Sequence, residues 1–189
     1  EMEALRRAGR VRKVPKNPDY PVYTFWDLGL NDLMTIWFAQ YIDGELYFID
    51  YHESSFQTWE FYAKLLLKKD HIYEMHFFPH DGNKRVRGGD AIVTDKELAE
   101  QQGIRPIKII PRTASVDNDI RNFCKTTIPL CYFDEENCAT GLNHLDNYRK
   151  VWSAKDSMFT SEPLHDEASH GADGFRTAAM AFKRGALEV

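Results

Sequence analysis

The feature that most constrains the fold is an apolar segment that ends in a carboxylate, Tyr23-Thr24-Phe25-Trp26-Asp27, followed by Leu28-Gly29. The segment is short and rich in aromatic residues, which predicts a buried strand. Asp27 then stands where a buried strand opens into a loop, and catalytic acids are common at such positions. The alternative interpretation of Asp27 is a turn residue ahead of Gly29.

Two later segments have a similar form. Phe77-Phe78-Pro79-His80-Asp81-Gly82 is a second apolar strand that ends in an acid, and 165–176 places Asp166 and Asp173 near the start of a helix. If the first strand is central and the second pairs beside it, Asp27 and Asp81 emerge at the same edge of a sheet. The alternatives are a simple turn at Asp81-Gly82 and a solvated helix acid at Asp173.

The order of expected elements predicts a mixed α/β fold. Strands are expected at 22–27, 33–41, 45–52, 74–79, 107–110 and 130–133, and helices at 56–69, 95–102, 115–125, 138–148 and 169–184. Asp43-Gly44 is typical of a tight hairpin turn, so the first three strands form an antiparallel meander. The later strands return through helical crossovers, which predicts helices on the faces of a mixed sheet. Residues 150–163 are expected to form a hairpin or flap.

Composition favours one soluble domain with a real core. The chain has 189 residues, 43% of them hydrophobic, and no apolar run reaches the roughly 18 residues of a membrane span. Residues 1–20 are rich in Arg and Lys and punctuated by Pro15 and Pro18, so we expect a basic linker there and a domain over 21–189. Glu1 is not an initiator methionine, which suggests a fragment of a larger protein. The net charge of −5 counts against a large nucleic-acid footprint but not against a local one.

The three cysteines are expected to be small buried hydrophobes. Cys124, Cys131 and Cys138 are odd in number, which disfavours a disulfide framework. Their even spacing allows a zinc site as an alternative, but no C-x-x-C pair is present and Pro129 interrupts any single helix that would carry all three.

Three acids at the ends of separate elements predict a divalent metal site. Asp27 and Asp81, held close together, would raise each other's pKa unless a cation shares them. Mg²⁺ and Mn²⁺ prefer carboxylate oxygen and water as ligands. With Asp173 as a third ligand, two ions about 3.5–4 Å apart could activate water and stabilise the leaving oxygen of a phosphodiester. Asp166 is either a fourth ligand, an orienter of His170, or a helix N-cap.

Further residues are candidates for supporting roles. His80 and His170 flank the acids and could contact phosphate or orient a ligand, although a structural histidine is an equal alternative at both positions. Basic residues that could follow a DNA backbone lie in an expected flexible loop after Asp81 and around the expected flap. They are Lys84, Arg85, Arg87, Arg149, Lys150 and Lys155, with a solvated surface as the alternative. The chain has no Walker A, G-x-S-x-G or H-E-x-x-H motif.

These motifs together resemble the C-terminal nuclease domain of the large terminase subunit of tailed bacteriophages. The residues that carry the resemblance are Trp26-Asp27-Leu28-Gly29, Pro79-His80-Asp81 and Ser169–Arg176, within roughly 20–184. The resemblance implies an RNase H-like (integrase-like) fold and a Mg²⁺- or Mn²⁺-dependent endonuclease. Asp27, Asp81 and Asp173 would be the catalytic acids and hold two metal ions. This chain has Gly174 where alanine is more usual, which lowers local helix propensity.

The resemblance also implies a biological setting. The nuclease would cut concatemeric viral DNA during packaging, with double-stranded DNA as substrate and an N-terminal ATPase domain on the same polypeptide. The portal protein and the small terminase subunit would be partners, and the location would be the host cytoplasm, outside the mature virion and without a membrane. The alternatives are another RNase H-like nuclease, of the Holliday-junction resolvase or transposase type, and a catalytically silent docking module of the packaging motor.

Overall fold

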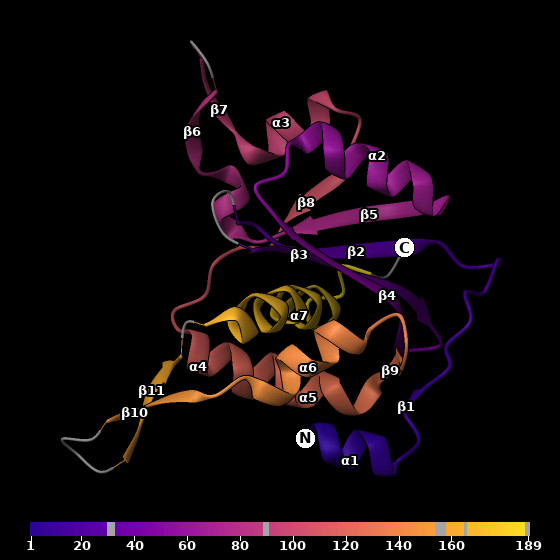
Figure 1. Ribbon diagram of the computed structural model, residues 1–189, viewed down its shortest axis with the longest axis vertical. Helices are drawn as coiled ribbons and strands as arrows, with labels where there is room; N and C mark the ends of the chain where they lie inside the picture. The colour runs from indigo at the N-terminus through magenta and orange to yellow at the C-terminus, as the bar shows by residue number, and fades with distance from the viewer. Residues whose placement is uncertain (30–32, 89–90, 154–157, 165, 188–189) are drawn as a thin grey trace.

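A computed structural model shows a seven-stranded mixed sheet with helices on both faces (Figure 1). The structure describes residues 1–29, 33–88, 91–153, 158–164 and 166–187, and within two hairpins, at 86–91 and 150–163, it describes mainly the backbone. None of the described helices is long and apolar enough to cross a membrane.

The centre of the sheet is an antiparallel meander of β2 (Val22–Asp27), β3 (Leu33–Ile42) and β4 (Glu45–Ser55). The turn between β3 and β4 has Asp43 at φ 49° and Gly44 at φ 84°, the left-handed pair that a two-residue hairpin requires. Parallel strands extend both sides of the meander. They are β5 (Tyr73–Phe78) and β8 (Ile107–Ile109) beyond β2, and β9 (Cys131–Asp134) and β1 (Val11–Arg12) beyond β4. The predicted pairing of the 22–27 and 74–79 segments is confirmed.

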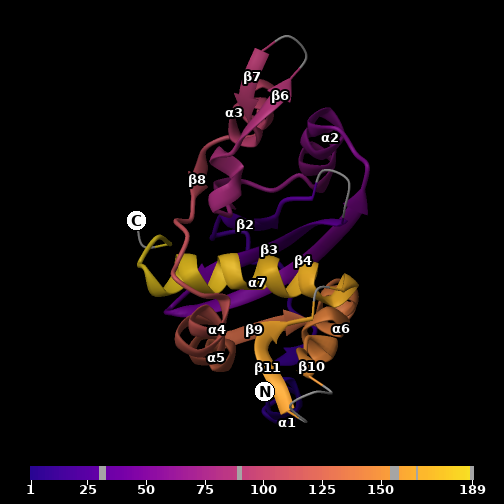
Figure 2. The same ribbon diagram turned by 90° about the vertical axis from the view of Figure 1, so that its left-hand side faces the viewer.

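The helices form two layers (Figures 1 and 2). One face carries α2 (Trp59–Lys69) and α3 (Asp95–Gln101), which begin at the caps Thr58 and Thr94. The other face carries α7 (Glu167–Lys183) and α6 (Ala139–Asn147). It also carries a helical segment made of α4 (Val116–Asp119), a π turn η2 (Ile120–Cys124) and α5 (Lys125–Thr127). The remaining short helices are α1 (Met2–Arg7), η1 (His80–Asn83) and η3 (Ile128–Leu130).

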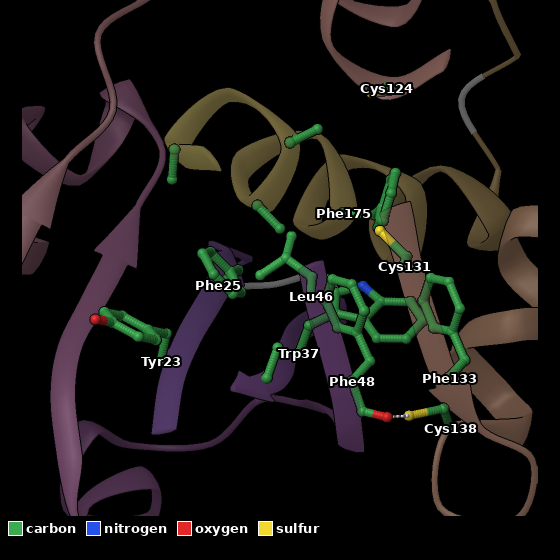
Figure 3. Close-up of a cluster of buried hydrophobic side chains, with 14 of the residues drawn as sticks. Tyr23, Phe25, Trp37, Leu46, Phe48, Cys124, Cys131, Phe133, Cys138 and Phe175 are labelled. Carbon is green, nitrogen blue, oxygen red and sulfur yellow. Dashed lines mark hydrogen bonds between the residues drawn. The ribbon is translucent and has the colours of Figure 1, made fainter. Parts of the chain in front are cut away.

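Side chains on the two faces of the sheet form two separate aromatic cores. Trp26 on β2 packs against Tyr62 of α2, with ring centroids 5.7 Å apart. On the opposite face, Phe48, Phe133 and Phe175 surround Trp37, and Phe48 stacks on Phe133 at 4.6 Å (Figure 3). Truncation of one such buried ring typically costs about 3–5 kcal/mol. These cores fix the sheet rigidly between its helices, and therefore fix the strand ends that carry the acids.

The three cysteines lie in or beside the second core, as predicted. Cys124, Cys131 and Cys138 are all buried free thiols. The Cys138 thiol donates to the carbonyl oxygen of Phe48 at 3.5 Å (Figure 3). Burial raises the pKa of the Cys124 thiol to about 12. A thiol in this state is a packing residue with little nucleophilic character.

The expectation of a flexible loop after Asp81 is wrong. β6 (Arg85–Gly88) pairs with β7 (Ala91–Thr94) in an antiparallel hairpin, and α3 follows it at once. The β-branched residues Val86, Ile92 and Val93 favour strand over loop, and they outweigh the glycine and basic residues that suggested flexibility. The second hairpin, predicted at 150–163, is confirmed as β10 (Lys150–Ser153) and β11 (Met158–Pro163).

Part of the segment expected to be a linker packs onto the domain. β1 pairs with β9 at the edge of the sheet. The side chains of Met2, Leu5 and Val14 are each less than 8% exposed. Residues 1–20 therefore contribute to the two cores.

Candidate active site

Asp27 is held at the end of β2 by a histidine from α7. Asp27 Oδ2 lies 3.1 Å from His170 Nδ1, and both side chains are largely buried. Burial raises the pKa of Asp27, the hydrogen bond and charge of His170 lower it, and the nearby Asp81 raises it again. The net pKa of Asp27 is above its usual range, so this carboxylate would be stabilised by a cation.

Asp81 lies within electrostatic range of Asp27, after the strand that pairs beside β2, as the strand order predicted. β2 and β5 are parallel neighbours, and η1, which contains Asp81, begins two residues after β5. The two acids interact electrostatically. Asp81 Oδ1 is buried and has no hydrogen-bond partner among the described residues. A buried carboxylate oxygen without a donor is unfavourable, and a bound cation would satisfy it.

The first turns of α7 are anchored to the meander. Thr35 Oγ1 donates to the carbonyl oxygen of His170 at 3.1 Å, and Trp37 Nε1 donates to that of Gly171 at 2.9 Å. Gly174 allows this approach, because a Cβ there would lie 2.8 Å from Thr35 Oγ1. The absence of a side chain at this position thus brings the helix close to the strand ends.

Asp173 is engaged within its own helix. Its Oδ1 lies 3.1 Å from Arg176 Nη1, one turn later on α7. Arg176 also acts on Asp27 electrostatically, so it faces the same region. Among the described residues, no group of three or more His, Cys, Asp or Glu side chains is arranged closely enough to hold a metal ion. The structure therefore pairs Asp27 with His170, places Asp81 within electrostatic range of Asp27, and pairs Asp173 with a cation of the chain itself.

Asp166 occupies the N-cap of α7. Its carboxylate accepts a hydrogen bond from the Ala168 backbone N–H at 3.1 Å, and Arg149 Nη2 lies 3.8 Å away. This is the helix N-cap role, one of the three roles that the sequence allows for Asp166. A role as a fourth metal ligand stays a prediction.

A row of polar side chains that the sequence reasoning missed extends from Asp27 across the meander. Asp27 pairs directly with Thr35 on β3, and Thr35 pairs with Glu53 on β4. Glu53 Oε2 accepts from Tyr51 Oη and contacts His144 Nε2, each at 2.7 Å. Burial, and then the hydrogen bond to Glu53, raises the pKa of Tyr51, which therefore stays a neutral donor. This row supports the α7 face of the sheet beside the acids.

Two further buried acids near the site were also missed. Asp95, the first residue of α3, is 7% exposed, and Asp119, the last residue of α4, is 4% exposed. Each has an Oδ1 atom with no hydrogen-bond partner in the described part of the chain. Burial raises the pKa of Asp95, a hydrogen bond from Trp59 lowers it and Asp81 raises it. In the sequence both acids look like ordinary helix-start residues, and only packing reveals them.

The remaining predicted residues lie around the acids. His80 is exposed and lines a cavity of about 130 Å³ together with Asp119 and Arg176. Lys84, Arg85 and Arg149 are exposed. The side chains of Arg87 and Lys150 and the whole of Lys155 lie outside the described residues. The two hairpins that carry most of these residues project from the same side of the molecule, above and below α7 (Figures 1 and 2).

The sequence matches no protein-family model and no curated protein. Solved structures share its fold. The nuclease domain of the P22 large terminase superposes with a TM-score of 0.67 at 13% identity, covering 93% of this chain and 89% of that one. The nuclease domain of g2p, the large terminase of bacteriophage SPP1, with bound Mn, gives 0.64 at 16% identity, covering 87% and 86%.

A longer protein also contains this fold. The large terminase of a thermophilic bacteriophage, in complex with ATP-gamma-S, superposes with a TM-score of 0.68 at 17% identity. The match covers 94% of this chain but 44% of the longer one, so the chain spans less than half of that protein. The predicted fold class, a mixed α/β sheet of the RNase H-like type found in terminase nuclease domains, is confirmed.

Proposed function

We propose that this chain is a Mg²⁺- or Mn²⁺-dependent DNA endonuclease that cuts concatemeric viral DNA during genome packaging. The observation that carries the proposal is the pair Asp27 and Asp81 at the carboxyl ends of adjacent parallel strands, with Asp81 Oδ1 buried and without a donor among the described residues. Two carboxylates that interact in this way are suitable oxygen ligands for a hard divalent cation. The fold is that of terminase nuclease domains, one of which was solved with bound Mn.

Asp27, Asp81 and Asp173 are the proposed ligands of two ions, with Asp166 as a further candidate. A divalent ion bound there would act as a Lewis acid that stabilises the charge developing on the scissile phosphate. His170 orients Asp27 through the 3.1 Å contact, and Thr35 and Trp37 hold the α7 turn that carries His170. These contacts fix one ligand before substrate arrives. His80, exposed at the edge of the same site, is a candidate for phosphate contact.

The proposed DNA contacts come from the two hairpins on either side of α7. Lys84 precedes β6, Arg85 is the first residue of β6, and Arg149 precedes β10. All three side chains are exposed. Arg87, Lys150 and Lys155 belong to the same proposal by their place in the sequence. Contacts from lysine and arginine to phosphate give affinity without base readout. We expect Lys84→Ala with Arg85→Ala to weaken duplex binding and to reduce its salt dependence.

The wider setting is proposed by analogy with whole large terminases. An ATPase domain on the same polypeptide would precede residues 1–20, and the portal protein and the small terminase subunit would be partners in the host cytoplasm. The second candidate is a junction resolvase or transposase on the same fold, and the third is a silent docking module. The buried oxygen of Asp81, unsatisfied within the described part of the chain, favours a metal-binding enzyme over the silent module.

The test is cleavage of supercoiled plasmid by the purified chain with Mn²⁺, Mg²⁺ or EDTA. Asp81→Asn removes the charge with little change in shape, and Asp70→Asn is the matched control on an exposed helix end. We expect metal-dependent nicking and linearisation by the wild type and the control, and a loss of at least about 100-fold in Asp81→Asn. Cleavage that survives Asp81→Asn would overturn the site. A preference for four-way junctions over linear duplex would favour the resolvase.

A further inference from the structure

Asp173 and Arg176 form an ion pair that competes with the metal role proposed for Asp173. Arg176 Nη1 lies 3.1 Å from Asp173 Oδ1, and the two side chains are only 21% and 25% exposed. A carboxylate held by a guanidinium in a partly buried site cannot give all of its oxygen lone pairs to a cation. For Asp173 to act as a full ligand, Arg176 needs another anionic acceptor.

Asp119 is placed to be that acceptor. It is 4% exposed, and its Oδ1 is buried without a hydrogen-bond partner in the described part of the chain. Burial lowers the pKa of Arg176, while Asp173 and more weakly Asp119 raise it, so both carboxylates lie in its electrostatic range. Arg176 and Asp119 also line one cavity, of about 130 Å³, together with His80 and Thr177. The cavity gives the guanidinium space to change partner.

We propose that Arg176 is a positioning residue with two alternative acceptors, Asp173 in the metal-free protein and Asp119 in the metal-bound protein. The inference rests on the proposed function, because it takes Asp173 as a metal ligand. A cation at the acids repels the guanidinium and attracts Asp173. A displaced guanidinium left alone in a partly buried site would be strongly unfavourable, and Asp119 removes that cost. Asp119 would therefore favour metal binding without contacting the metal.

The test is the affinity for Mn²⁺, measured by titration calorimetry without DNA. We expect Asp119→Asn to weaken binding roughly tenfold, because a charge-assisted hydrogen bond in the metal-bound state is lost. The control is Asp117→Asn on the same helix, which removes the same charge from a residue paired with Arg121 at 2.7 Å. We expect that control to change the affinity by less than about twofold. With Arg176→Gln already present, Asp119→Asn should have no further effect, because the coupling needs both groups.

A second measurement does not depend on the variants folding. Crystal structures of the wild type with and without Mn²⁺ should show Arg176 on Asp119 in the first and on Asp173 in the second. Arg176 still paired with Asp173 in the Mn²⁺ structure would overturn the inference, and so would equal affinities for Asp119→Asn and Asp117→Asn. Binding that is lost in Asp81→Asn but unaffected by Asp119→Asn would overturn this inference alone. A wild type that binds no Mn²⁺ would overturn it together with the proposed metal site.

Discussion

His170 Nδ1 lies 3.1 Å from Asp27 Oδ2, so the first turn of α7 holds the acid at the end of β2. The contact joins residues 143 positions apart in sequence. It is supported from behind by the hydrogen bonds of Thr35 and Trp37 to the same turn. The ionisation of Asp27 and the placement of α7 are therefore linked.

The raised pKa of Asp27 predicts that the negative charge of Asp27 destabilises the metal-free protein. A pKa higher in the folded than in the unfolded chain means that the folded state binds the proton more tightly. The stability contributed by the protonated group is present at low pH and is lost as the pH rises from about 3.9 through the folded pKa. Near pH 7 in EDTA, we expect Asp27→Asn to raise the melting temperature by a few degrees. Differential scanning calorimetry would check this, and a lower melting temperature would contradict it.

Loss of the His170 contact should move the pH dependence of metal binding. The contact lowers the pKa of Asp27, so without it that pKa rises further and protons compete with metal up to higher pH. We expect His170→Ala to shift the acid limb of Mn²⁺ affinity to higher pH. His170→Asn, which retains a donor, should shift it less. Superimposable pH profiles for the wild type and His170→Ala would show that the contact has no electrostatic role.

The sequence predicted the elements well where one local signal decided the structure. The run 22–27 formed a strand within its predicted bounds, and the turn at Asp43-Gly44 closed the expected hairpin. The expectation that acids at adjacent parallel strand ends meet at one sheet edge placed Asp27 near Asp81. These features follow from periodicity and turn chemistry, which are local properties.

The sequence did not predict features that depend on register or packing. Counting back from the turn at Asp43-Gly44 pairs Thr35 with His52, but a bulge between Phe38 and Ala39 shifts the register by one residue. Such a shift exchanges the faces of the strand and brings Glu53 into the row with Asp27. The burial of Asp119 likewise depends on tertiary packing, which no local pattern encodes. The ion pair of Asp173 with Arg176 is different, because its i,i+3 spacing on one helix can be read from the sequence.

Gly174 should be intolerant of even a methyl group. Alanine gains roughly 1 kcal/mol of helix propensity, but its Cβ would lie 2.8 Å from Thr35 Oγ1 and 3.1 Å from Trp37 Cδ1. Overpacking of this kind costs about 1–3 kcal/mol, so we expect Gly174→Ala to destabilise the protein in urea unfolding. In a Thr35→Ala background the clash with the hydroxyl is absent and the 3.1 Å approach to Trp37 Cδ1 remains, so the same change should be less destabilising. A stabilising effect in both backgrounds would contradict the close approach.

The buried His76 should contribute to acid sensitivity. Trp26 Nε1 donates to Thr24 Oγ1 at 2.7 Å, and His76 Nδ1 is hydrogen-bonded to the same hydroxyl, also at 2.7 Å. Burial lowers the pKa of His76 from 6.5 to about 4. Its contribution to stability is therefore complete above about pH 6.5 and is lost as the pH falls toward about 4. Between about pH 7 and pH 4.5, we expect the wild type to lose about 2–3 kcal/mol more than His76→Asn in urea unfolding. Equal losses would show that His76 does not titrate in this window.

Substitutions of Asp166 distinguish a role in helix capping from a role in metal binding. Asparagine caps helices about as well as aspartate but carries no charge, whereas alanine neither caps the helix nor carries a charge. Because the Asp166 carboxylate accepts from the Ala168 N–H, we expect Asp166→Ala to cost about 1 kcal/mol of stability and Asp166→Asn to cost little. If capping is its whole role, Asp166→Asn should also bind Mn²⁺ and cleave plasmid within about twofold of the wild type. A stable Asp166→Asn variant with greatly weakened Mn²⁺ binding would instead make Asp166 a ligand, and would mean that α7 exchanges its N-cap for the metal.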